Sequence, residues 1–175
     1  VMRGKYINMD KFATALEKGF GFCDVVFGWD IMDELYDKQS VTGWHTGFPD
    51  ALAKIDVNSF RIIPWEPDTA LFIADFESPD GTPYPACPRQ LCKTILKRAD
   101  DMGYEVKSAF EYEFFLFDES PNSIRDKKYD NLIAFTPGMF GYSILRNSVH
   151  SELYHDFINT CRKMNFELEG IHTET

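Results

Sequence analysis

The segment 108–117, with the sequence SAFEYEFFLF, limits the possible folds of this chain more than any other part. Its density of aromatic residues predicts a buried strand. Side chains alternate along a strand, so Glu111 and Glu113 would lie on one face, about 7 Å apart. Phe115 and Phe117 continue that face, which indicates that water does not cover all of it. The solvated face of an edge strand is the alternative interpretation.

Glu111 and Glu113 are predicted to be metal ligands. Two carboxylates held this close repel each other, and removing them from water is costly. A hard divalent cation relieves both costs, because carboxylate oxygens are its natural ligands.

Composition limits the classes of partner. The 175 residues are enough for one or two domains, and the 44% that are hydrophobic can build a real core. A formal net charge of −10 argues against nucleic acid or an anionic membrane as the main partner and suits a site that recruits cations. The cysteines form no Cys-x-x-Cys pair, and the chain shows neither a signal peptide nor a long apolar run. We therefore expect a cytoplasmic protein with reduced thiols.

Residues 1–82 are predicted to form a small α+β domain. Asn8 is a suitable N-cap for a helix over 9–18, and Gly19 is suited to end that helix. Strands are expected at 2–7, 23–29, 51–55, 59–63 and 69–76, and a turn is expected at 78–81.

The segment 30–50 is rich in turn-forming residues, which predicts an ordered loop. An ordered loop of this length is usually functional. Trp44 within it is either a packing residue or a contact for a partner.

Residues 83–175 are predicted to form a second domain after a proline-rich linker. Its expected elements are a helix at 89–102 with an apolar stripe, the strand at 108–117, a polar surface excursion at 119–137, a helix running to 164 and capped by Ser148, and a strand at 166–172.

The last predicted strand adds further acidic residues. Glu169 and Glu174 are five positions apart and would face opposite ways in an ideal strand, although a bend at Gly170 could change that. With Glu174 near Glu111 and Glu113, three carboxylates would form one cluster. Only one or more cations would make such a cluster stable.

These motifs resemble those of the glutamine synthetase family. The run FEYEFFLF at 110–117 resembles the first metal-binding strand of that family, and EGIHTE at 169–174 resembles its second glutamate motif. Further similarities are MRGKYI at 2–7, RIIPW at 61–65, DGTP at 80–83 and PRQL at 88–91. The resemblance therefore extends along the whole chain.

The resemblance implies an α+β fold in two parts. An N-terminal β-grasp-like domain would occupy 1–82. The first part of a catalytic α/β domain, an antiparallel sheet with helices on one side, would occupy 83–175. The chain is expected to be truncated, because the family's glycine-rich continuation and its next metal glutamate would follow Thr175. The intact protein is expected to be a homo-oligomeric ring, dodecamer-like.

The resemblance also implies an activity. Family members join the γ-carboxylate of glutamate to ammonia or an amine, using ATP, through an acyl phosphate, with Mg²⁺ or Mn²⁺. Carried over by position, Glu113 and Glu174 would hold one ion and Glu111 the second. Glu169 would lie at the nucleotide. His172 is given no ligand role.

The sequence SVTGW at 40–44 resembles the family loop that reaches into the neighbouring subunit's site. That register places Asp37 where members bind ammonium; an ordinary loop aspartate is the alternative. Lys38 and Gln39 follow where glutamine synthetases proper tend to have Gly and Ser, so the chain looks more like the branch that joins glutamate to polyamines or other amines.

Three other functions stay open. They are glutamine synthetase itself with ammonia, a catalytically silent structural relative, and a plain cation-binding module. The three retained carboxylates argue against the silent relative, because a protein without the activity has no reason to tolerate clustered negative charge.

Overall fold

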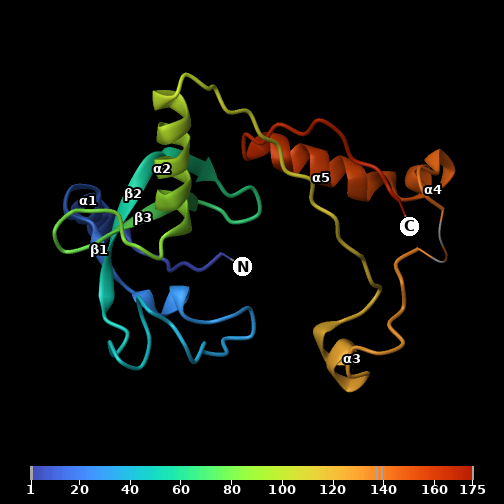
Figure 1. Ribbon diagram of the computed structural model, residues 1–175. Helices are drawn as coiled ribbons and strands as arrows, with labels where there is room; N and C mark the ends of the chain where they lie inside the picture. Colours follow the sequence, from blue (N-terminus) through green and yellow to red (C-terminus); the bar gives the residue numbers. More distant parts are fainter. Residues whose placement is uncertain (1, 137, 139, 175) are drawn as a thin grey trace. The chain divides into compact units, whose positions relative to one another are not determined.

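The computed structural model describes residues 2–136, 138 and 140–174, and divides into two compact units, Val1–Lys107 and Ser108–Thr175 (Figure 1). The first unit contains α1 (Met9–Lys18), β1 (Phe20–Cys23), the 3-10 helix η1 (Asp24–Phe27), β2 (Asp50–Ile62), β3 (Ala70–Glu77) and α2 (Pro88–Asp101). The second contains α3 (Pro121–Asp126), α4 (Ile144–Val149) and α5 (Ser151–Lys163). The expected domain boundary between residues 82 and 83 stays a prediction.

Helix α1 confirms the helix predicted at 9–18. The Asn8 side chain accepts a hydrogen bond from the Lys11 amide at 2.8 Å, which satisfies one of the free donors of the first turn. Gly19 ends the helix with φ at 74°. A Cβ at Gly19 would lie 2.7 Å from the Ala53 carbonyl oxygen, so only glycine fits between α1 and β2.

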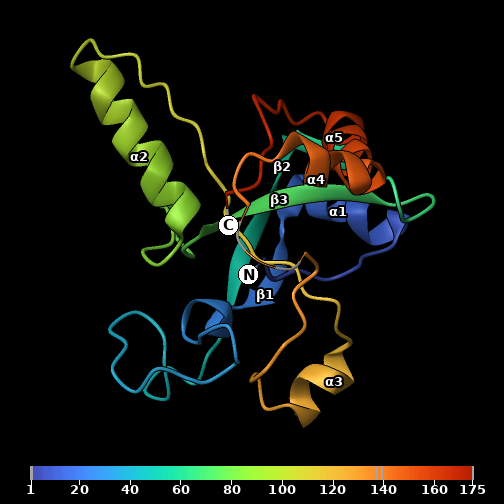
Figure 2. The same cartoon turned by 90° about the vertical axis from the view of Figure 1, so that its right-hand side faces the viewer.

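The sheet is antiparallel in the order β1-β2-β3, and Figure 2 shows its strands from the side. Strand β3 confirms the strand predicted at 69–76. The strands predicted at 51–55 and 59–63 are one strand, β2, with a bulge between Asp56 and Arg61. The sheet confirms an antiparallel α+β unit, whereas the β-grasp topology is not confirmed.

Two strand predictions in this unit were wrong. At 23–29 the chain leaves β1 after Cys23 and forms η1, because the Asp24 side chain turns inward to hydroxyl groups described below. At 2–7 the chain is irregular. Cation–π contacts hold that segment in place: the Arg3 guanidinium lies 4.9 Å from the Trp29 ring centroid, and the Lys5 ammonium lies 4.7 Å from that of Phe22.

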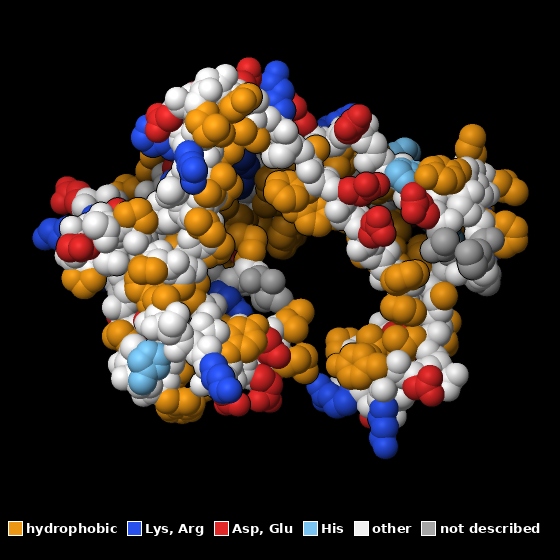
Figure 3. All heavy atoms as spheres, in the orientation of Figure 1, with side chains coloured by type: hydrophobic (Ala, Val, Ile, Leu, Met, Phe, Trp, Pro, Cys, Tyr) orange, Lys and Arg blue, Asp and Glu red, His pale blue; other side chains and the backbone are white. Residues whose placement is uncertain are grey.

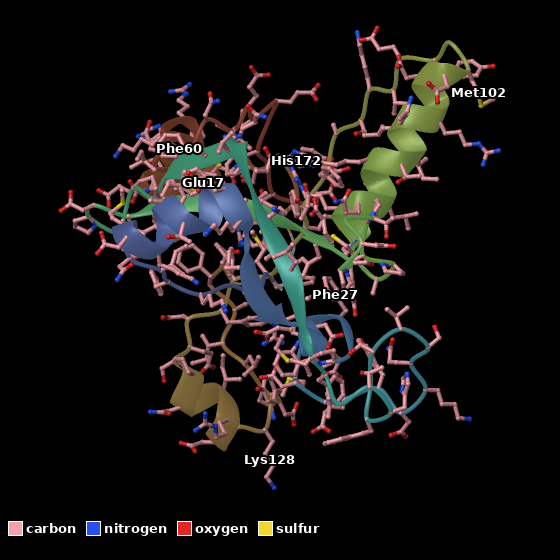
Figure 4. All side chains as sticks on the ribbon, turned by 90° about the vertical axis from the view of Figure 1, so that its left-hand side faces the viewer. Glu17, Phe27, Phe60, Met102, Lys128 and His172 are labelled. Carbon is pink, nitrogen blue, oxygen red and sulfur yellow. The ribbon has the colours of Figure 1, made fainter. Side chains whose placement is uncertain are left out.

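Aromatic rings fill much of the space around the sheet. Phe12 of α1 lies 4.9 Å from Phe72 of β3, and Phe27 of η1 (labelled in Figure 4) meets Phe76 edge to face at 4.9 Å. Tyr84, in the segment after β3, stacks on Phe27 at 5.5 Å. These contacts join α1, η1 and the start of the linker to one sheet.

Helix α2 confirms the predicted helix, and its apolar stripe is largely exposed. Leu91 is 61% exposed and Met102, labelled beyond the end of the helix in Figure 4, is 64% exposed. The contact with the sheet is ionic instead. The Arg89 guanidinium contacts both oxygens of Asp75 at 2.8 Å and Asp56 at 2.5 Å, and the Lys93 ammonium also binds Asp75.

The second unit departs further from expectation. The helix predicted to run from 149 to 164 is two helices, α4 and α5, separated at His150. Ser148 caps neither. It lies inside α4 and its hydroxyl bonds the Ile144 carbonyl, whereas Ser143 caps α4. Met164, which follows α5, is buried, whereas Val149 at the end of α4 is exposed.

The strands predicted at 108–117 and 166–172 were wrong. Within the described part of this unit no strand forms, and a bridge between Phe117 and Ala134 is the nearest approach to pairing. Phe110 and Tyr112 are 81% and 80% exposed, so the predicted buried aromatic layer is absent there. Figure 3 shows hydrophobic side chains, in orange, on the visible surface of the molecule. Strand propensity describes the fit to a pleated, half-buried surface, and the described residues of this unit give 108–117 no neighbouring strand to supply one.

The excursion predicted at 119–137 is held by one glutamate. The Glu119 carboxylate accepts hydrogen bonds from the Ile133 amide at 2.8 Å and the Ser123 hydroxyl at 2.5 Å, and it pairs with the Lys127 ammonium. These donors, Lys127 first, lower the pKa of Glu119 to about 2. Its stabilising effect is therefore complete above about pH 4.5 and is lost as the pH falls through 2.

We expect Glu119→Gln to loosen this excursion, because glutamine can still accept the Ile133 amide but loses the charge that attracts Lys127. Trypsin cleavage at Lys127 and Lys128 (Lys128 points outward in Figure 4) should become roughly fivefold faster near pH 8. Glu105→Gln is the control, since Glu105 is exposed and makes only a 3.5 Å contact with Lys107. Unchanged cleavage rates would show that Glu119 does not hold the segment.

No described helix combines the length and the apolar character needed to cross a lipid bilayer.

Candidate active site

The four glutamates singled out from the sequence, Glu111, Glu113, Glu169 and Glu174, all lie in the second unit and are exposed. Across residues 2–136, 138 and 140–174, no three His, Cys, Asp or Glu side chains gather closely enough to hold a metal ion. The predicted convergence of three carboxylates is therefore not formed by the residues described. The ligand roles stay predictions.

Glu174 has the best-defined surroundings of the four. Its Oε1 accepts a hydrogen bond from the Tyr142 hydroxyl at 2.9 Å and lies 3.3 Å from His172 Nε2. The rings of Tyr142 and His172 stack with centroids 4.9 Å apart, so the two residues support each other beside the carboxylate. His172 thus has a partner that sequence analysis did not give it.

The backbone fixes Tyr142 beside Glu174. The Tyr142 amide donates to the Thr173 carbonyl at 2.6 Å. A Cβ at Gly141 would lie 2.2 Å from the Glu174 carbonyl oxygen, so glycine is required for the two segments to approach this closely. The Thr173 hydroxyl is bonded in turn to Asn147 of α4 at 3.1 Å. Helix α4 therefore positions the end of the 169–174 motif.

The charge of Glu111 also affects the pKa of Tyr142, the residue that binds Glu174. Hydrogen bonding from Tyr142 first, and then from His172, lowers the pKa of Glu174. The pKa of Tyr142 is raised, mainly by Glu174 and in smaller part by the charge of Glu111. The carboxylates of Glu111 and Glu174 thus act on one tyrosine, even though the predicted strand that was to align them is absent.

The donor chemistry of these residues fits a divalent cation. Carboxylate oxygens are the preferred ligands of Mg²⁺ and similar hard ions. Both hydrogen bonds to Glu174 involve Oε1. Such bonds to a ligating carboxylate orient it, as outer-sphere partners do at metal sites.

Glu169 lies on the wall of an open hollow of about 620 Å³ between α5 and the segment that follows it. Arg162 of α5 and the apolar residues Phe166 and Leu168 line the same hollow. The space combines a cation, a carboxylate and apolar surface, although nothing in it tests the predicted role of Glu169 at a nucleotide.

Asp37 belongs to the first unit and is exposed on the predicted loop. Trp44 on that loop is 75% exposed, with one edge-to-face contact to Phe48 at 5.4 Å. Of the two interpretations of Trp44, burial as a packing residue is wrong. A partner contact stays a prediction.

Sequence reasoning missed Tyr142 and the buried pair Asp24 and Thr42. Tyr142 has a positive φ of 57°, unusual for a residue with a side chain, but no sequence periodicity marks it. Asp24 was assigned to a strand. A charged residue between Cys23 and Val25 in an otherwise apolar stretch was the available signal that it needed buried partners.

Residues 85–175 match the family described as glutamine synthetase, catalytic domain. The chain is 42% identical to "Type-1 glutamine synthetase 2" of Dictyostelium discoideum, over 100% of this chain and 33% of that protein. It is 29% identical to "Glutamate--isopropylamine ligase" of a Pseudomonas species, over 99% of this chain and 38% of that protein. The chain therefore spans about a third of the length of the curated relatives it matches.

Among solved structures, the crystal structure of a novel glutamine synthase homolog aligns with a TM-score of 0.64 at 18% identity. The alignment covers 98% of this chain and 37% of that one, and at this identity it shows the fold alone. The match to the catalytic domain covers more than half of the chain and contains all four glutamates. On this evidence the chain belongs to the glutamine synthetase family.

Proposed function

We propose that the intact protein carrying this chain is an ATP-dependent ligase that joins the γ-carboxylate of glutamate to an amine. The observation that carries the proposal is the catalytic-domain match over 85–175, because it includes Glu111, Glu113, Glu169 and Glu174. One relative is named as a glutamate–isopropylamine ligase, and another is named as a glutamine synthetase.

In this proposal each acidic residue has a separate task. Glu113 and Glu174 would hold one Mg²⁺ or Mn²⁺ ion, and Glu111 would hold the second. Ions bound there would supply positive charge that neutralises phosphate and carboxylate charge. Tyr142 and His172 orient Glu174 through its Oε1. Glu169 contributes to the ATP site.

Asp37 would bind the amine, in its protonated form, through charge. The presence of Lys38 and Gln39 after Asp37 favours an amine over ammonia. Ammonia is the second candidate, supported by the printed name of the 42% identical relative. We further propose a ring-shaped homo-oligomer in the cytoplasm, a compartment in which the four free cysteines would stay reduced.

A phosphate-release screen of the intact protein tests the proposal. With ATP, glutamate and Mg²⁺ fixed, ammonia, putrescine, ethanolamine and isopropylamine are supplied in turn. We expect at least one amine to give a kcat/KM roughly tenfold or more above that of ammonia, which corresponds to a modest difference in contacts. Ammonia as the best substrate would indicate glutamine synthetase itself.

Two results would reject a ligase altogether. Magnesium binding without any ATP binding would indicate a cation-binding module, and neither metal nor ATP binding would indicate a silent structural relative. We expect residues 1–175 expressed by themselves to release no phosphate, because the described residues bring no three candidate ligands together. Amine-dependent release by that piece would contradict this expectation.

A further inference from the structure

The loop that carries Asp37 is attached at two points to one short turn. The Tyr36 amide donates to the Gly28 carbonyl at 2.9 Å, and the Thr42 hydroxyl donates to Asp24 Oδ1 at 2.7 Å. Both acceptors belong to η1 or to its C-terminal cap. Residues 37–41 therefore connect two points that are both hydrogen-bonded to η1 or its C-terminal cap.

Asp24 is the centre of this attachment. It is 2% exposed, and its two oxygens are each bound by a hydroxyl, Oδ1 by Thr42 and Oδ2 by Tyr84, both at 2.7 Å. Its own amide donates to the Pro49 carbonyl at the far end of the loop, at 3.0 Å. Burial first, and then the bond to Asp24, raises the pKa of Tyr84, so that hydroxyl remains a donor. A buried carboxylate is tolerated only when such donors satisfy it.

Burial changes abruptly along the loop. Thr42 is fully buried, whereas Trp44, two residues later, is 75% exposed, and Asp37 is exposed as well. Gly28 is closely packed there, because a Cβ would lie 3.3 Å from the Phe48 ring and 3.6 Å from the Thr42 methyl group. The loop is thus fixed at its base while Asp37 and Trp44 face outward.

We propose that Asp24 is a positioning residue, which through Thr42 holds the loop so that Asp37 meets the amine in the assembled enzyme. This inference rests on the proposed function for the role of Asp37, whereas the anchoring itself does not. It adds Asp24 and Thr42 to the residues that determine amine affinity, although neither touches the amine.

Two isosteric substitutions separate positioning from stability. Thr42→Val and Tyr84→Phe each remove one hydroxyl from the same buried carboxylate, so both should lower the melting temperature of the intact protein. Only Thr42→Val releases the loop. We expect it to raise the KM for the amine about tenfold, with the KM values for ATP and glutamate unchanged. Tyr84→Phe should leave all three KM values near those of the wild type, and Thr42→Ser, which keeps the hydroxyl, should restore the amine KM.

Hydrogen exchange gives a second readout that needs no activity. Amides of residues 36–48 should exchange roughly tenfold faster in Thr42→Val than in Tyr84→Phe. If Thr42→Val does not fold, Thr42→Cys replaces it, because a thiol is a weaker donor. Equal exchange and equal amine KM values in the two variants would overturn the inference. Absence of ligase activity in the wild-type protein, together with the expected exchange difference between the two variants, would overturn the proposed function and leave the anchoring intact.

Discussion

Replacing Glu113 by Ala in the intact protein should lower kcat by about 10²–10³-fold, because the metal ion that Glu113 is proposed to hold would contribute several kcal/mol to catalysis. Glu113 is exposed in the second unit. Its loss should therefore leave the melting temperature within about 1 °C of the wild type, since surface substitutions seldom affect stability. Phosphate release with saturating ATP, glutamate and amine measures the first quantity, and calorimetry measures the second.

Glu105→Gln is the matched control, since Glu105 is also an exposed glutamate and precedes the aromatic segment. It should retain wild-type turnover. Glu113→Gln, which keeps the size and loses the charge, should behave as Glu113→Ala does. A rise in the Mg²⁺ concentration needed for half-maximal rate would support the metal role directly. Near-normal turnover of both Glu113 variants would contradict it.

Helix-capping residues and proline predicted the helix ends of the first unit well, because these residues act on their immediate neighbours in the chain. Asn8 and Gly19 define α1 at both ends, and Pro88 marks the start of α2. The buried carboxylate of Asp24 shows the limit of such signals, because its partners Thr42 and Tyr84 are 18 and 60 positions away along the chain. Only the three-dimensional structure brings those hydroxyls to it.

The strand prediction for the aromatic segment 108–117 was wrong for a different reason. Its alternating pattern is a property of a strand beside other strands, and the described residues offer it a bridge to Ala134 and a stacked contact between Phe114 and Phe157 of α5, at 5.7 Å. Pattern alone cannot show whether a neighbouring strand exists. The candidate ligands were named from that pattern and from resemblance, while the support that Tyr142 gives to Glu174 depends on a close approach at Gly141.

Arg89→Met should destabilise the first unit more than any other single change on α2. It leaves Asp75, which is buried, with Lys93 alone, and removes the 2.5 Å contact to Asp56. Breaking a fully buried ion pair costs about 3–5 kcal/mol, and because the Arg89 side chain is 32% exposed we expect about 2–3 kcal/mol. All three tryptophans of the 175-residue chain lie in the first unit, so their fluorescence during urea unfolding reports that unit alone.

Lys97→Met is the matched control, because it removes a cation of the same helix from an exposed pair with Asp101 and should cost less than about 0.5 kcal/mol. The pH dependence adds a second test. Hydrogen bonding from Arg89 lowers the pKa of Asp56 below 3.8, so the stabilisation is present above that pH and is lost as the pH falls through the lowered value. The stabilities of wild type and Arg89→Met should therefore begin to converge only as the pH falls below 3.8, toward the lowered pKa of Asp56. A constant difference between pH 7 and pH 3, or equal losses in both variants, would mean that α2 is held to the sheet by something other than these charges.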